Sequence, residues 1–146
     1  MQQDVDVIEL KDQVSSDLCR HEGFVPHAYQ DHLGYWTIGI GRLIDERRGG
    51  GISEDEARYL LRNDIDRIVS LLQREQGYRD APDIVRRALV NMAYQLGVTG
   101  LLGFGKMWAA LEQQNYSLAA EEALDSVWAK QTPTRAREVA SWIRSG

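Results

Sequence analysis

Apolar residues recur at three- and four-residue steps along most of this chain, which is the spacing of amphipathic helices. One such stripe near the N-terminus comprises Val7, Leu10, Val14 and Leu18. Gly23 follows this stripe, and glycine is common just past the end of a helix. We therefore expect a first helix that ends at Glu22.

The helical period disappears between Phe24 and Leu43. The segments "HAYQ" and "YWTIGIG" are rich in aromatic and β-branched residues, as strands are, and "DHLG" between them has turn chemistry. In the second strand, alternation puts Thr37, Gly39 and Gly41 on one face. Two glycines on one face leave room for another group to approach the backbone, or they mark a bulge or a tight crossing. If they leave room, the Thr37 hydroxyl on the same face is expected to point to open space.

Helical spacing returns after residue 52. "DERRGGG" is expected to be a flexible polar loop, and Ser53 with Glu56 forms a capping box that starts a long helix over about 54–74. The remaining helices are predicted at 83–96 before Gly97, at about 106–113 and 117–124, and at 133–144 with Thr132 as N-cap and Pro133 at the first position.

The predicted elements indicate one α+β, mainly α domain over residues 1–146, with two lobes. The small β-containing lobe comprises about 24–53, and the connecting helix comprises 54–74. Residues 1–23 and 75–146 are expected to form the larger helical lobe. Trp108, Trp128 and Trp142 are predicted to pack inside it or between lobes.

Composition and charge exclude several classes of protein. The chain has 146 residues, a net charge of −5 and a pI of about 5.2, which argues against general nucleic-acid binding. No apolar run approaches the roughly 20 residues of a membrane span, so no membrane insertion is expected. The acidic start "MQQDVDVIEL" does not resemble a signal peptide.

Metal and disulfide chemistry are not expected either. Cys19 is the single cysteine, so an internal disulfide framework is excluded. His21, His27 and His32 are spaced by six and five residues, which does not put them on one helix face. The C-terminal seventeen residues hold four basic side chains and one acidic one, which indicates a solvated helix face or a surface for an anionic partner.

Two carboxylates in the opening region suggest chemistry. Glu22 and Asp31 are nine residues apart on different elements, and paired carboxylates across a cleft are the groups that hydrolyse glycosidic bonds. A glutamate packed against Phe24 would hold its proton more tightly, and Thr37 could hold a water molecule. Taken alone, the pair is better explained as ordinary surface carboxylates, because the chain has 22 acidic residues and such pairs arise by chance.

The segment "HEGF…AYQDHLGYWTIGIGRL" resembles the catalytic region of the phage lysozymes of glycoside hydrolase family 24, above all the T-even type. That family has a helix-end Glu-Gly, an aspartate nine residues on, and a threonine six residues further within T-I-G-I-G. Glu22, Asp31 and Thr37 match these types and spacings. Further similar segments are "ISEDEARYLLRNDIDRIV", "VRRALVNMAYQLGVTGLLGF" and "WAKQTPTRAREV".

The resemblance implies roles for these residues. Glu22 would be the general acid, and Asp31 with Thr37 would position the attacking water in an inverting reaction. Leu43, Tyr94 and Gln95 match cleft positions that bind substrate, although Tyr94 could equally be the edge of a core helix. Two other cleft positions, a serine and an asparagine in the relatives, are Met107 and Glu122 here, so binding is not transferred to them.

The chain also departs from the family at one charged pair. The relatives have histidine where this chain has Arg42, and the aspartate that pairs with it matches Asp64. An arginine at this position predicts a bidentate Arg42–Asp64 ion pair. Unlike histidine, arginine would not titrate near neutral pH.

The resemblance further implies a monomeric endolysin that degrades peptidoglycan and needs no cofactor and no metal. We expect it to stay in the host cytoplasm until a separate holin opens the membrane, and then to reach the periplasm and the cell wall. A lysozyme attached to the virion remains an alternative. So does an inactive sugar-binding module, although such a module would not need Glu22, Asp31 and Thr37 together.

Overall fold

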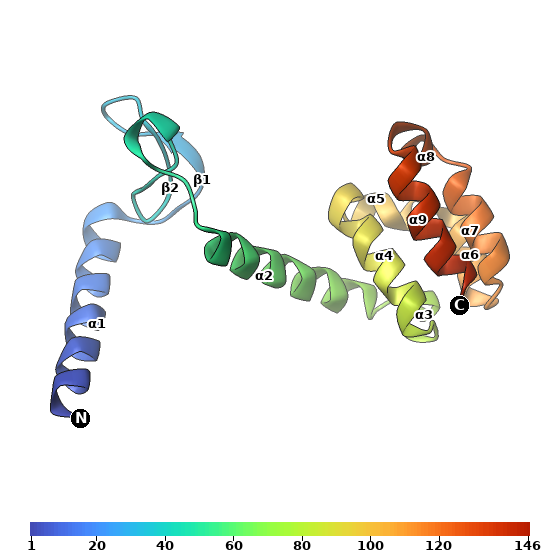
Figure 1. Ribbon diagram of the computed structural model, residues 1–146, viewed down its shortest axis with the longest axis horizontal. Coiled ribbons are helices and arrows are strands. Elements are labelled where there is room, and N and C mark those ends of the chain that lie inside the picture. Colours follow the sequence, from blue (N-terminus) through green and yellow to red (C-terminus); the bar gives the residue numbers. More distant parts are fainter. The chain divides into compact units, whose positions relative to one another are not determined.

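The computed structural model describes the backbone of residues 1–146 and the side chains of residue 1 and residues 8–146. Its contacts fall into two compact units, Met1–Ala57 and Arg58–Gly146. The first holds the sheet and the second is helical (Figure 1). The predicted α+β, mainly α class is confirmed. The predicted grouping of residues 1–23 with the helical lobe stays a prediction.

The first unit begins with α1 (Gln2–Glu22), which ends at Gly23 as predicted. A three-stranded antiparallel sheet follows in the order β1 (Val25–Gln30), β2 (Trp36–Gly39) and β3 (Arg42–Leu43). The register of β1 with β2 shifts between the pairs Val25–Gly39 and Tyr29–Thr37. Such an irregularity bends a strand locally.

The helix α2 (Glu54–Leu72) starts at the predicted capping box. The Glu56 amide donates to Ser53 Oγ at 3.2 Å, and the Ser53 amide donates to a Glu56 carboxylate oxygen at 3.1 Å. Both free amides at this helix start therefore have partners, which fixes where the helix begins.

The second unit is a helical bundle. Its predicted helices are α4 (Asp83–Leu96), α6 (Gly105–Glu112), α7 (Tyr116–Leu124) and α9 (Pro133–Arg144). Three short helices were not predicted: α3 (Gln76–Arg79), α5 (Val98–Leu102) and α8 (Val127–Gln131). Four or five residues are too few to display a helical period, which is why sequence pattern misses them.

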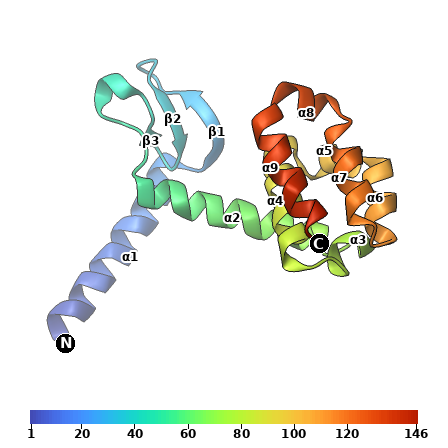
Figure 2. The same ribbon diagram turned by 45° about the vertical axis from the view of Figure 1, so that its right-hand side comes forward.

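The core of the second unit lies where α9 packs on α4 and α7 (Figure 2). Its largest fully buried side chains are Leu72, Leu89, Met92, Leu101, Met107, Leu111, Ile143, Val85 and Val139. Trp108 and Trp128 are buried there, as predicted. Trp142 is partly buried at the edge, under the guanidinium of Arg87, whose carbon lies 4.1 Å from the ring centre.

The start of α9 differs in one detail from the expectation. Thr132 is the N-cap residue and Pro133 opens the helix, as predicted, but no cap bond from the threonine side chain forms. The Thr132 hydroxyl donates instead to the Trp128 carbonyl at 3.0 Å. Arg135, one of the basic C-terminal residues, binds α4 of the same unit, because its Nε donates to Asn91 Oδ1 at 3.0 Å.

Candidate active site

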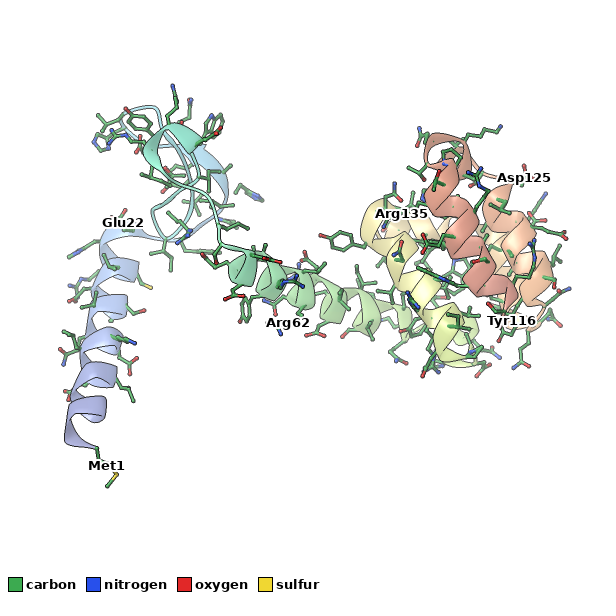
Figure 3. The ribbon with its side chains drawn as sticks, viewed as in Figure 1. Met1, Glu22, Arg62, Tyr116, Asp125 and Arg135 are labelled. Atoms are coloured by element: carbon green, nitrogen blue, oxygen red, sulfur yellow. The ribbon has the colours of Figure 1, made fainter. Side chains whose placement is uncertain are left out.

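Glu22 is the last residue of α1 (Figure 3). Gly23 stops the helix with φ 69°, and its amide donates to the Cys19 carbonyl at 3.0 Å. Glu22 is exposed, and Phe24 is 72% exposed, so the expected packing of Glu22 against Phe24 is not found. The carboxyl group lies over Gly41, the last residue of the connection between β2 and β3.

Asp31 builds the turn between β1 and β2. Its Oδ1 accepts from the amides of Leu33 and Tyr35, each at 2.9 Å, and its own amide donates to the Tyr35 carbonyl at 2.9 Å. Gly34 completes the turn with φ 85°. The hydrogen bonds of the carboxylate fall on Oδ1, which leaves Oδ2 for other chemistry.

Thr37 differs from the expectation of a hydroxyl that points to open space. The residue is only 3% exposed, and its Oγ1 donates to the Tyr35 carbonyl at 3.1 Å. That expectation is therefore wrong. It used strand alternation alone, whereas Thr37 lies in the middle strand of the sheet, paired with Tyr29 on one side and Leu43 on the other.

The three predicted catalytic residues all lie in the first unit. Asp31 and Thr37 are at the same end of the β1–β2 hairpin, and the Tyr35 carbonyl accepts hydrogen bonds from both the Asp31 amide and the Thr37 hydroxyl. Glu22 precedes β1 and Asp31 follows it directly, so this bent strand separates the two carboxylates.

The predicted Arg42–Asp64 pair would join residues of different compact units, and it stays a prediction. Within the first unit, Arg42 donates to Glu56 at 3.1 Å and, through Nε and a terminal nitrogen, to the Gly51 carbonyl at 3.2 and 3.0 Å. Within the second unit, Asp64 pairs with Arg67, one turn along the same helix. Glu56 is available to Arg42 because the capping box holds its carboxylate at the start of α2.

This arrangement affects the acidity of Glu56. Hydrogen bonds from the Ser53 amide and hydroxyl lower the pKa of the Glu56 carboxyl, and the charge of Arg42 lowers it further. The capping residue is thus held in its ionised form, which is the form that binds both groups.

A further ion pair, not predicted, lies in "DERRGGG", where a flexible loop was expected. Asp45, 8% exposed, accepts from the Arg47 amide and Nε at 3.0 Å and from a terminal nitrogen at 2.6 Å. It caps the short 3-10 helix η1 (Glu46–Arg48). The neighbouring Arg48 stacks on Tyr35, 4.0 Å from the ring centre.

The predicted substrate-binding residues lie in both units. Leu43 is in β3 of the first unit and is half-buried. Tyr94 and Gln95 are in α4 of the second unit. Tyr94 is 51% exposed, whereas Gln95 Oε1 accepts from the Trp128 indole at 2.8 Å and so joins α4 to α8.

Two cavities in the second unit are lined by residues that the family resemblance placed in the cleft: Tyr94 in one, and Met107 with Glu122 in the other. One of about 510 Å³ is lined by Asp64, Arg67, Ile68, Leu71, Ala93, Tyr94, Gly97 and Val98. Another of about 350 Å³ is lined by Gly103, Phe104, Gly105, Lys106, Met107, Glu122, Asp125 and Ser126. The exposed half of Tyr94 therefore borders open space rather than core.

Among the described side chains, residue 1 and residues 8–146, no group of three or more His, Cys, Asp or Glu residues could hold a metal ion. Within the same part of the chain, no helix is long and apolar enough to cross a membrane. The expectation that the protein works without a cofactor stays a prediction.

Comparison with known proteins identifies the family. The sequence model described as phage lysozyme matches residues 19–141. The chain belongs to the phage lysozyme family. The matched region contains Glu22, Asp31 and Thr37 and includes parts of both compact units. The protein is therefore a glycoside hydrolase of the lysozyme type, whose substrate is peptidoglycan.

Individual relatives within and beyond phages agree with this assignment. "Probable T4-type lysozyme 1" of Dictyostelium discoideum is 28% identical over 96% of both chains. "Pre-baseplate central spike protein Gp5" of Enterobacteria phage T4 is 30% identical over 88% of this chain and 27% of its own length. "Endolysin" of Acyrthosiphon pisum secondary endosymbiont phage 1 is 38% identical over 36% of both.

Proposed function

We propose that this lysozyme is an N-acetylmuramidase that hydrolyses the β-1,4 bond between N-acetylmuramic acid and N-acetylglucosamine, with Glu22 as general acid. The supporting observation is that one compact unit contains an exposed helix-end carboxyl group and an aspartate with one oxygen free of turn hydrogen bonds. These are the two carboxyl groups that glycoside hydrolysis requires.

The reaction proceeds with inversion. Glu22 donates its proton to the bridging oxygen while the bond from that oxygen to the anomeric carbon breaks. A water molecule attacks the anomeric carbon from the opposite face, and Asp31 Oδ2 accepts its proton. An inverting reaction needs carboxyl groups roughly 6.5–9.5 Å apart when substrate is bound, so that the water fits between them. Solvent then returns a proton to Glu22 and removes one from Asp31.

Thr37 assists Asp31 in this proposal. Its hydroxyl group donates its proton in a hydrogen bond to the Tyr35 carbonyl. The hydroxyl oxygen can therefore only accept a further hydrogen bond, and in this proposal it accepts one from the attacking water. Thr37→Val keeps the shape of the side chain but removes the acceptor, and we expect kcat to fall at least tenfold. Thr37→Ser, which retains the hydroxyl, should keep most of the activity. Equal activity in both variants would restrict Thr37 to a structural role.

The test of the reaction uses purified peptidoglycan. Digestion should release reducing sugar ends without new free amines, and NMR of the first product should detect the inverted anomer. Glu22→Gln should lose this activity about 10²–10⁴-fold. Glu121→Gln, at an exposed position on α7, is the matched control and should remain active. New amines without reducing ends would indicate an amidase or peptidase instead.

Tyr94 is proposed to contact the sugar chain. Its ring is half exposed beside a cavity, and aromatic faces pack well on sugar rings. Tyr94→Ala should raise KM for peptidoglycan several-fold with little change in kcat. Tyr59→Ala is the control, because Tyr59 is also exposed, at 61%, and lies on α2. An unchanged KM would assign Tyr94 to the edge of the helical core.

We also propose that the protein acts as a monomeric endolysin in the host cytoplasm and is released by a separate holin. The similarity to a phage endolysin supports this route. Cells expressing the protein alone should stay intact until a membrane-permeabilising agent is added. Prompt lysis without such an agent would exclude the route, and light scattering of the purified protein would measure its oligomeric state.

A lysozyme carried by the virion is the second candidate, because the similarity to the T4 central spike protein covers 88% of this chain. The two candidates differ in where the protein is found. A virion lysozyme would purify with intact particles, whereas a free endolysin would remain in the supernatant of the lysate.

A further inference from the structure

The two glycines of "TIGIG" look equivalent in the sequence. They flank Ile40 between the paired residues Ile38 and Arg42: Gly39 is the last residue of β2, and Gly41 is the last residue before β3. Gly39 has φ 71° and Gly41 has φ 66°, a backbone conformation that costs energy for residues with a Cβ atom. Backbone conformation therefore explains both glycines equally and does not separate them.

The two glycines differ in the space that a side chain would have at each position. A Cβ atom added to Gly39 would meet nothing within 4 Å. A Cβ atom added to Gly41 would lie 2.5 Å from Glu22 Oε2, 2.7 Å from its Cδ and 3.0 Å from its Cγ. These distances are shorter than normal van der Waals contacts, so the Glu22 carboxyl group occupies the position of the missing side chain.

The connection between β2 and β3 also borders the last turns of α1. Ile40 lines an apolar cavity of about 530 Å³ together with Leu18 and Cys19, which lie in those turns. The end of α1 and this connection therefore lie close together within the first unit, in agreement with the position of Glu22 over Gly41.

Within the first unit, no described residue forms a hydrogen bond or ion pair with the Glu22 carboxyl group. The end of α1 at Gly23 fixes where the side chain begins, and the backbone of Gly41 limits where it extends. Within this unit, steric packing against Gly41 therefore positions the carboxyl group.

We propose that Gly41 is a positioning residue for the general acid, and that its missing side chain sets where the Glu22 proton is presented to the leaving oxygen. The inference rests on the proposed role of Glu22. Any side chain at position 41 would displace the carboxyl group, and misplacement by about 1 Å can cost on the order of 10²-fold in rate. Since Glu22 is exposed and can move aside, the displacement itself should cost little stability.

The test compares Gly41→Ala with Gly39→Ala on purified peptidoglycan. Both variants introduce the same backbone strain and should lower the melting temperature by similar amounts. Only Gly41→Ala should lower kcat, by at least tenfold more than Gly39→Ala, with KM little changed. Gly41→Asn provides a second variant in case Gly41→Ala folds poorly, because asparagine tolerates positive φ while still adding a Cβ atom.

A double-mutant cycle of Glu22 and Gly41 distinguishes a displaced Glu22 carboxyl group from a general loss of structure. Glu22→Asp shortens the side chain and withdraws the carboxyl group from the new Cβ atom, so Gly41→Ala should cost less than about threefold in that background. An equal loss of kcat for both glycine variants, or the same Gly41→Ala penalty in both backgrounds, would overturn the inference. An active Glu22→Gln variant would instead refute the proposed general acid itself.

Discussion

The two compact units of this lysozyme are stabilised in different ways. Every described buried apolar side chain belongs to the second unit, from Leu72 at the end of α2 to Ile143 in α9. In the first unit the buried side chains are polar, Thr37 and Asp45. The second unit is therefore specified by hydrophobic packing, and the first by the hydrogen bonds of its turns. The proposed catalytic groups all belong to the unit that turn chemistry specifies.

The largest expected effect is the loss of kcat when Asp31 in the first unit is replaced by asparagine, which removes the charge but keeps the turn. Asp31→Asn keeps an oxygen that can accept from the Leu33 and Tyr35 amides but removes the negative charge. We expect kcat to fall about 10²–10⁴-fold, the usual range for a general base, while the free energy of unfolding changes by less than about 0.5 kcal/mol. Initial rates and urea unfolding would measure both.

Asp12→Asn, at an exposed position of α1, is the control for this substitution. It should change neither the rate nor the stability. An Asp31→Asn variant with normal activity would remove Asp31 from the mechanism, and an unfolded one would mean that the charge itself holds the turn.

The next effect concerns the packing of the second unit. Leu89 is fully buried in α4, so Leu89→Ala should lower the free energy of unfolding by about 2–5 kcal/mol through lost contacts and a cavity. The rate per folded molecule should stay normal well below the melting temperature. Leu118→Ala, 40% exposed on α7, should cost much less. Similar losses for both leucines would contradict a core centred on α4.

A smaller effect is expected for the bond between α4 and α8. Gln95→Ala removes the acceptor of the Trp128 indole N–H and should cost about 1–3 kcal/mol, the penalty for an unpaired buried donor. Thermal unfolding would measure the loss, with Gln113→Ala at an exposed position as control. A rise in KM alone, without loss of stability, would assign Gln95 to substrate binding only.

The smallest effect depends on pH. The Arg47 guanidinium lowers the pKa of the Asp45 carboxyl, and burial opposes this only in part. The pair should therefore stabilise the fold above the ordinary aspartate pKa of about 3.9 and stop doing so as pH falls through the lowered folded value. The effect should be small because Arg47 is 76% exposed and solvent screens the pair.

Asp45→Asn tests this pair, since the amide oxygen can still cap η1. The variant should be less stable than the wild type at pH 7, and the difference should narrow at pH values below about 3.9. Glu46→Gln, in the same short helix, is the matched control. A deficit of the same size at both pH values would mean that the charge of Asp45 contributes nothing.

Much of the fold could be predicted because local signals and tertiary packing agree. Ser53 with Glu56 and Gly23 after α1 each use hydrogen bonds within a few residues, so the sequence pattern is sufficient. The candidate catalytic residues were found by spacing and family resemblance. Their local contacts were not, because the orientation of Thr37 depends on two neighbouring strands and on the Tyr35 carbonyl.

Charged pairs were the least predictable feature. Arg42 was assigned to Asp64 by resemblance, and its partner within the first unit, the Glu56 carboxylate that the capping box fixes, was not predicted. Asp45 was assigned to a flexible loop because "DERRGGG" is polar and rich in glycine, yet three hydrogen bonds from Arg47 order it. Which partner a long side chain selects depends on distances that sequence spacing does not contain.

The turn at Asp31 has an evolutionary consequence. The hydrogen bonds to Leu33 and Tyr35 require an oxygen at this position, not a charge, and asparagine supplies that oxygen. Aspartate and asparagine codons differ by one nucleotide. With Asp31 as the proposed base, a single transition mutation would give a folded protein that still binds the cell wall but no longer cuts it. Inactive descendants of this kind should therefore arise readily.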